Sequence, residues 1–223
     1  MATFGKIGAT RMLTTSTAKA YIHDGLIAMW DGLENAGYGI HTADTQEVVD
    51  LISGTKVYSV SGISQKGWAY STVPFLLSRL SNKFTIEITL TQTAWRTSNQ
   101  GSYIWPDPWV DKVCELFEYP IRQHYFQVKL AGASMHNFNI KIPLGLSRLS
   151  VSGNGSTVVG YVNDTYANWS FNRSFSSYSN NKFGLGIAGN TGYIHNVRFY
   201  NRALSATEIA SNYTIDRRRF SAT

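Results

Sequence analysis

The chain has 223 residues, of which 15% are charged and 13% aromatic, and its formal net charge is +6 at pH 7. This length suits one β-sandwich domain with a substantial core, and no apolar run is long enough to cross a membrane as a helix. Residues 1 to 20 contribute +3 and the run Asp216-Arg217-Arg218-Arg219 adds +2, which leaves +1 for the body. A nearly neutral body lacks the clustered cations that track phosphates, so nucleic acid is not an expected partner.

Residues 1 to 20 carry Lys6, Arg11 and Lys19 without an acidic residue. They lack the apolar stretch of a secretory signal peptide, although their composition also fits a transit peptide. We expect an extended arm that becomes ordered against a partner or against a neighbouring copy of the chain. For the basic residues at the C-terminus we expect a solvated tail.

The next segment, up to Gly54, contains a predicted strand at residues 25 to 31 and a polar loop rich in acidic residues. Their spacing matches no dedicated calcium loop, so we assign no metal site, with calcium kept only as an alternative. No other cofactor is expected. The acidic residues considered are Asp24, Asp31, Glu34, Asp44, Glu47 and Asp50.

Short alternating runs follow at residues 57 to 70 and 73 to 80, and a regular strand is predicted for Phe84 to Leu90. In that strand, apolar side chains alternate with Thr85, Glu87 and Thr89, so one face belongs to the core. The polar face either lines the concave side of a sandwich or meets water. We expect water.

Residues 91 to 112 contain Trp95, Tyr103, Trp105 and Trp109, interrupted by prolines 106 and 108. Because proline cannot donate to a strand ladder, we expect a long loop here. Indole rings stack on the apolar faces of sugar rings and carboxylates bind sugar hydroxyls, which favours a glycan site. The alternative is that these rings close one end of the sandwich. A second candidate loop spans residues 165 to 178, and the glycan-binding candidates together are Trp95, Tyr103, Trp105, Asp107, Trp109, Tyr166 and Trp169.

Glu115 and Glu118 are the carboxylates that could serve catalysis. Residues three apart in a strand face opposite sides, so the two cannot reach one glycosidic bond without a bulge. The five histidines form no pair with metal-ligand spacing, and no nucleophile elbow, phosphate loop or dinucleotide fingerprint occurs. We assign no catalytic residue and expect no enzymatic activity.

The sequence of the C-terminal part predicts two hairpin turns and a short helix. Gly153-Asn154-Gly155-Ser156 is typical of a hairpin turn, and residues 189 to 192 are expected to join two strands, 183 to 187 and 193 to 200, into another hairpin. Ser205 precedes Glu208 by three residues, the spacing of a capping box that begins a short helix.

The end of this segment, Tyr200 to Ser205 with the helix that follows, resembles the end of laminin G-like, concanavalin A-type jelly rolls. Further matching segments are Gly25–Asp31, Asp50–Gly54, Phe84–Leu90 and Val158–Asp164, with Asp164 where the family has glycine. The resemblance implies an all-β, concanavalin A-like sandwich with a short C-terminal helix. The expected organisation is an arm at 1–20, a jelly roll at 21–204, and a helix with a basic tail at 205–223. Laminarinase-type glucanases on this fold use two glutamates and an intervening aspartate on one strand, and that aspartate is missing here.

Residues 24 to 37 are similar to sequences of phage and prophage structural proteins. Together with the arm and the aromatic loops, this similarity implies a non-catalytic module of a bacteriophage virion, located on the particle or at an extracellular surface. We expect it to bind host-surface carbohydrate, to contact other virion proteins through the arm, and to form homo-oligomers. A purely structural virion protein is the alternative, and a β-glucanase-like hydrolase would explain only the fold.

Overall fold

The structure of the chain is a computed structural model, which describes residues 20–31, 47–53, 56–64, 67–73, 79–94, 101–107, 114–119, 124–175, 182–188 and 191–221. Fourteen strands and one long helix make up the described part. The strands are β1 (Leu26–Asp31), β2 (Glu47–Val49), β3 (Lys56–Ser64), β4 (Gly67–Val73), β5 (Lys83–Ala94), β6 (Gly101–Asp107), β7 (Cys114–Tyr119), β8 (Tyr125–Leu130), β9 (His136–Lys141), β10 (Gly145–Asn154), β11 (Thr157–Val162), β12 (Thr165–Ser170), β13 (Lys182–Ala188) and β14 (Thr191–Tyr200). The helix is α2 (Ala206–Phe220).

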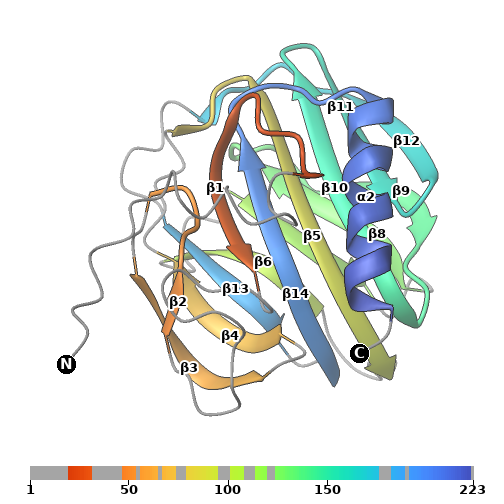
Figure 1. The fold of residues 1–223 in the computed structure, drawn as a ribbon. Coiled ribbons are helices and arrows are strands. Elements are labelled where there is room, and N and C mark those ends of the chain that lie inside the picture. Colours follow the sequence, from red (N-terminus) through yellow and green to blue (C-terminus); the bar gives the residue numbers. More distant parts are fainter. Residues whose placement is uncertain are drawn as a thin grey trace.

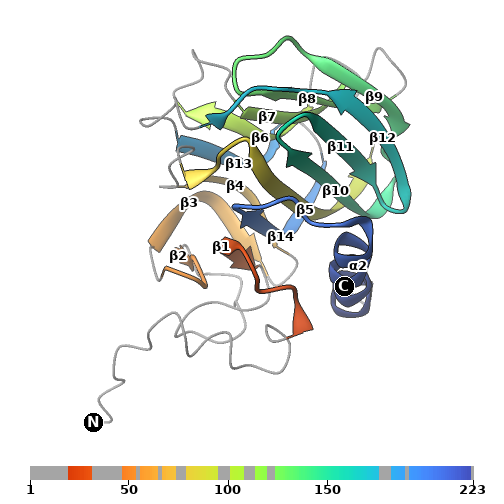
Figure 2. The same ribbon diagram turned by 90° about the horizontal axis from the view of Figure 1, so that it is seen from above.

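The strands pair antiparallel in the order β12-β11-β10-β5-β14-β4-β13-β6-β7-β8-β9, with β1 beside β14 and β2 and β3 extending from β4. This continuous sheet folds over on itself, so its first and last strands, β12 and β9, lie against each other (Figures 1 and 2). The expected all-β sandwich with a C-terminal helix is confirmed.

The core lies between the two halves of the folded sheet. On β5 it is made by Phe84, Ile86, Ile88 and Leu90, which are fully buried as the alternation of that strand predicted. The neighbouring strands β10 and β14 add Leu149, Val197 and Phe199, and the strands β8 and β9 of the other half add Phe126, Val128 and Phe138. Burying side chains of this size stabilises each by about 1.5–3 kcal/mol relative to exposure.

The opposite face of β5 corrects one expectation. Thr85, Glu87 and Thr89 do not meet water but are fully buried, because α2 lies across the outer face of β5, β10 and β14 (Figure 1). The capping box that begins this helix is confirmed: the Ser205 side chain accepts from the Glu208 backbone N–H, and Glu208 accepts from the Ser205 N–H at 2.8 Å. The helix runs for 15 residues.

Of the two hairpins predicted in the C-terminal part, one is confirmed and the other is wrong. The Gly153–Ser156 turn joins β10 and β11 as expected, with Gly155 at a φ of +103° and the Asn154 side chain accepting from the Ser156 N–H. The other expected hairpin is wrong, because β13 and β14 do not pair with each other. Strand β4 pairs with both of them and lies between them, so the short connection joins strands two positions apart.

The expectation of a loop across residues 91 to 112 is wrong in part. β5 continues to Ala94, and residues 101–107 form β6, which pairs with β7 and β13. Pro106 is tolerated because the paired register between β6 and β7 ends at Ile104, two residues earlier. Proline therefore falls where the strand has a neighbour on one side only.

Candidate functional site

The structure divides the predicted glycan-binding residues into three groups. Trp95 and Trp109 lie outside the described residues. Tyr103, Trp105 and Asp107 belong to β6, whose backbone is described but whose side chains are not. Tyr166 and Trp169 both lie on β12, a sheet-edge strand rather than the loop we expected, and their surroundings are fully described. The candidate site is therefore built from β12 and its neighbours.

Tyr166 stands on the outer face of β12. It pairs across the strands with Tyr161, and the two rings lie 5.8 Å apart. Tyr161 is almost fully buried among Tyr200, Leu204 and Ile209, whereas 61% of Tyr166 is exposed. The buried ring packs against the exposed ring at an interplanar angle of 40°, which leaves an exposed aromatic surface that a sugar ring can stack on.

Trp169 points to the opposite face of β12, because residues three apart in a strand lie on opposite faces. It is half-buried against the core and stacks flat on His136 of β9, with ring centroids 4.6 Å apart and an interplanar angle of 4°. Burial lowers the pKa of His136 below its usual value, so the ring is uncharged at neutral pH. Trp169 thus joins the two edge strands, which supports the packing interpretation for this residue. His136 was not singled out from the sequence, since a lone histidine gives no signal before its partner is known.

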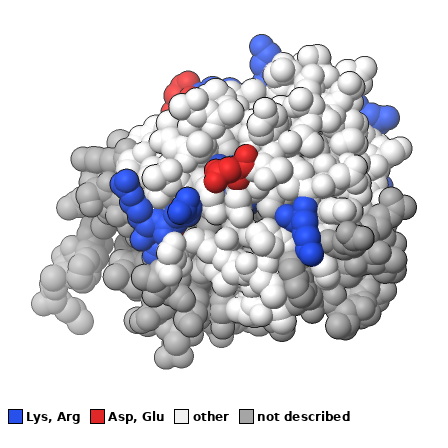
Figure 3. Space-filling view, turned by 90° about the vertical axis from the view of Figure 1, so that its right-hand side faces the viewer, with Lys and Arg blue, Asp and Glu red and all other residues white. Residues whose placement is uncertain are grey.

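The line along which β9 and β12 meet is here called the seam. The exposed uncharged polar side chains on these two strands are Asn139 on β9 and Thr165, Asn168 and Ser170 on β12. Asn168 and Ser170 share the outer face of β12 with Tyr166, whereas Thr165 lies on the opposite face and lines a cavity at one end of the seam. The seam widens there into this cavity of about 430 Å³, lined by Lys141, Pro143, Leu144, Val162, Asn163 and Thr165. The face that lies on the right-hand side of Figure 1 shows a few scattered charged side chains among mostly uncharged described atoms (Figure 3). This combination of amides, hydroxyls and an exposed aromatic ring is suited to neutral hydroxylated ligands.

The wall of this cavity is held by the turn between β11 and β12. Asn163 adopts a left-handed backbone with a φ of +54°, so the conformation that requires glycine in the resembling family is taken one residue before Asp164. The turn is tied to β10 from both sides: the Arg148 N–H donates to the Asn163 side chain at 2.9 Å, and the Asn163 N–H donates to the Arg148 carbonyl at 2.9 Å. The Arg148 guanidinium also donates to the Asn163 and Ile209 carbonyls. Helix α2 therefore supports one side of the cavity.

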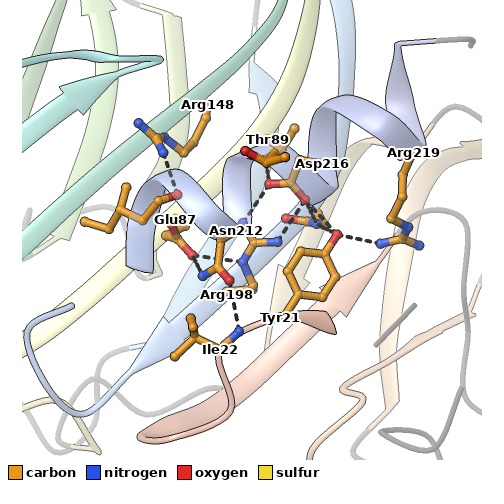
Figure 4. Close-up of polar contacts among 12 residues, drawn as sticks. Tyr21, Ile22, Glu87, Thr89, Arg148, Arg198, Asn212, Asp216 and Arg219 are labelled. Carbon is orange, nitrogen blue, oxygen red and sulfur yellow. Dashed lines mark hydrogen bonds and ion pairs between the residues drawn. The ribbon is translucent and has the colours of Figure 1, made fainter. Parts of the chain in front are cut away.

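Beneath α2 lies a buried network of charged groups centred on Arg198 of β14 (Figure 4). Arg198 donates to Glu87 at 2.9 Å and to both carboxylate oxygens of Asp216 at 2.9 and 2.7 Å. All three side chains are fully buried. Burial by itself would raise the pKa of Asp216, but the Arg198 guanidinium and its hydrogen bonds lower it below the usual value.

The network reaches both ends of the described chain. Tyr21 donates to Asp216 at 2.7 Å and accepts from Arg219 at 2.8 Å, and Arg219 also forms an ion pair with Asp31. Arg219 is therefore not part of a solvated tail, which corrects that expectation. Because these groups are buried and their contacts are to one another, the network fastens α2 to the sheet and does not form a ligand site.

The remaining chemical candidates give no further site. Strand β7 pairs with β8 in unbroken register from Cys114 to Tyr119, so its backbone shows no bulge along this pairing between residues 115 and 118; the side chains of Glu115 and Glu118 lie outside the described part of the structure. Among the described residues, no three His, Cys, Asp or Glu side chains gather as metal ligands. In the same part of the chain, no helix is long and apolar enough to cross a membrane.

Solved structures with a similar fold include parts and domains of enzymes. The chain matches Trypanosoma rangeli sialidase in complex with 2,3-difluorosialic acid with a TM-score of 0.64 at 13% identity, over 91% of this chain and 37% of the sialidase chain. It also matches domain 4 of AbnA, a GH43 extracellular arabinanase from Geobacillus stearothermophilus in complex with arabinotriose, with a TM-score of 0.55 at 14% identity, over 86% of this chain and 99% of that domain. The chain thus spans about a third of the sialidase chains and nearly the whole arabinanase domain. No protein-family model and no curated protein sequence matches it.

These neighbours contradict the expectation that the chain has no enzymatic activity. The sialidase and the arabinanase are both enzymes, and they contain the fold of this chain. Neither the spacing of Glu115 and Glu118 nor the lack of known catalytic motifs decides the question, because a hydrolase can place its acid and its base on other elements. The correction is that this is a β-sandwich of a kind found in carbohydrate-active enzymes.

Proposed function

We propose that this chain is a carbohydrate-binding β-sandwich module that holds a neutral oligosaccharide against Tyr166 and the seam. The observation that carries the proposal is the 61% exposed ring of Tyr166, which packs against the Tyr161 ring and is followed on the same face of β12 by the exposed Asn168 and Ser170. The fold supports it, because the arabinanase domain that matches nearly end to end was solved with arabinotriose. Sugar rings present apolar faces to aromatic rings and hydroxyls to polar rims, which is the chemistry this surface offers.

The test is direct titration of the full chain with neutral oligosaccharides, arabinotriose first and then the best ligand from a glycan array. We expect Tyr166→Ala to weaken binding at least several-fold, because an exposed ring supplies about 1 kcal/mol or more of stacking contact. Tyr166→Phe keeps the ring and should keep most of the affinity. The unfolding midpoint should be nearly unchanged in both variants, since the side chain is mostly exposed.

An exposed serine on α2, Ser211, provides the matched control, and Ser211→Ala should bind as the wild type does. If Tyr166→Ala binds the selected oligosaccharide as tightly as the wild type, the site is not at this ring. If no neutral oligosaccharide binds at all, the proposed function fails.

The finer proposal is that the module belongs to a bacteriophage particle and touches carbohydrate on the host surface. It rests on the similarity of residues 24 to 37 to phage structural proteins and on the basic arm. We propose further that residues 1 to 20 anchor the module to other virion proteins or to further copies of the chain. Mass spectrometry of purified particles tests the first point, and the sedimentation of the chain with and without residues 1 to 20 tests the second; an unchanged assembly would remove the role of the arm.

A further inference from the structure

The outer face of the last turns of α2 carries a second group of polar side chains, separate from the seam. Thr214, Arg217, Arg218 and Ser221 follow one another at helical spacings of three, one and three residues, so they form one stripe. All four are exposed, and together they line a shallow hollow of about 300 Å³. We refer to it as the α2 hollow.

The positive charge of this hollow is not balanced by its neighbours. The acid of the same run, Asp216, is buried against Arg198, and the third arginine, Arg219, is paired with Asp31. In the described part of the chain, neither Arg217 nor Arg218 makes an ion pair, although Arg217 lies over the Tyr213 ring at 5.9 Å. Two cations therefore face outward, and together they outweigh the half negative charge that the helix C-terminus carries.

The two hydroxyls of the hollow are set up to accept hydrogen bonds. The Thr214 hydroxyl donates to the Ala210 carbonyl at 3.0 Å, and the Ser221 hydroxyl donates to the Arg217 carbonyl. Because each hydroxyl proton is already donated to a helix carbonyl, each oxygen can accept a hydrogen bond from a donor on a ligand. A ligand that fits has a carboxylate for the guanidiniums and hydroxyl donors for these oxygens. An acidic peptide segment also offers carboxylates, but its donors are backbone N–H groups, whereas a sugar carries hydroxyl donors on the same ring as its carboxylate.

We propose that the α2 hollow binds an acidic sugar unit, a carboxylate-bearing residue of an anionic polysaccharide. This site is independent of the proposed function at the seam, which takes a neutral sugar and uses other residues. The hollow is one exposed subsite, so its affinity is expected to be modest and to fall with salt, because exposed charges are screened over about 8–10 Å at physiological ionic strength.

The experiment titrates the full chain with trigalacturonate, with neutral galactotriose and with a hexaglutamate peptide at low and at physiological salt. We expect trigalacturonate to bind more tightly than either comparison ligand. The double variant Arg217→Ala with Arg218→Ala should weaken that binding at least tenfold. Thr214→Val with Ser221→Ala should weaken binding of trigalacturonate several-fold and leave binding of hexaglutamate unchanged.

Several outcomes would overturn the proposal. Equal binding of hexaglutamate, unaffected by loss of the two hydroxyls, would make the hollow a docking site for acidic protein segments. Absence of trigalacturonate binding, or binding that survives the double arginine variant, would leave Arg217 and Arg218 as cations that merely complement the helix end. Binding of the neutral ligand at the seam should be the same in all these variants, so failure of one proposal is distinguishable from failure of the other. Circular dichroism confirms that each variant remains folded.

Discussion

Removing one charge from the network beneath α2 should destabilise the domain strongly. In Asp216→Asn the side chain keeps its shape but loses its charge, while Arg198 stays fully buried with Glu87 as its remaining carboxylate partner. Asp216 accepts hydrogen bonds from Arg198 at 2.9 and 2.7 Å, from Tyr21 at 2.7 Å, from Thr89 at 2.6 Å and from Asn196 at 2.8 Å. Breaking a buried ion pair by removing one partner costs about 3–5 kcal/mol. For a domain of this size, that lowers the melting temperature by roughly 6–20 °C.

A double-mutant cycle measures the interaction energy between Arg198 and Asp216 separately from their contacts with other residues. Arg198→Met alone leaves Glu87 and Asp216 buried without their shared cation, so it should also cost about 3–5 kcal/mol. In the double variant Arg198→Met with Asp216→Asn, Glu87 keeps an attractive interaction with Arg148, and the ion pair between Arg219 and Asp31 also remains. The double variant should therefore lose less stability than the sum of the single variants, by about 0.5–3 kcal/mol. Urea unfolding followed by circular dichroism measures all four free energies of unfolding, with Ser211→Ala on the exposed face of α2 as the control.

The pH dependence of the free energy of unfolding gives a second measure of how much this network stabilises the domain. The pKa of Asp216 is lower in the folded chain than in the unfolded chain, so its contribution is fully present above the unfolded value of about 3.9 and is lost as the pH falls through the folded value. Asp216→Asn should lack this part of the acid destabilisation. If the changes in free energy of unfolding of the two single variants add up to that of the double variant, or if Asp216→Asn costs less than about 1 kcal/mol, the network contributes little and this reasoning is refuted.

Two further predictions concern local features. Ser205→Ala removes the side-chain acceptor of the capping box and should lower the free energy of unfolding by about 1 kcal/mol. Thermal unfolding should show this as a melting temperature lower by about 2–4 °C. An unchanged melting temperature would mean that Glu208 and Arg202 hold the start of the helix without the serine hydroxyl. The pKa of His136 is lowered by burial, so the unfolded chain takes up the proton first and stability falls as the pH drops from above about 6.5 through the folded value. Urea unfolding at several pH values should show this loss in the wild type and less of it in His136→Phe, and equal losses in both would contradict it.

The parts of the fold that depend on neighbouring residues could be predicted from the sequence. The alternation from Phe84 to Leu90, the Gly153–Ser156 turn and the capping box at Ser205 each involve contacts over a few residues, and all three are confirmed. The site was predicted only in part. Tyr166 was selected for its chemistry, but its packing depends on Tyr161 of the neighbouring strand, and the role of Trp169 depends on His136.

By itself, the sequence determined the all-β class, the positions of most strands and the start of the helix, because strand and cap patterns are local. Only the tertiary structure decided what lies on each face. The polar face of β5 is buried because a helix from the end of the chain covers it, and Tyr21 meets Asp216 across 195 residues. The same holds for β4, which pairs between β13 and β14 where a hairpin was expected. Such contacts depend on how strands distant in sequence are brought together, and no short pattern of residues specifies which polar face will receive a partner and which will meet water.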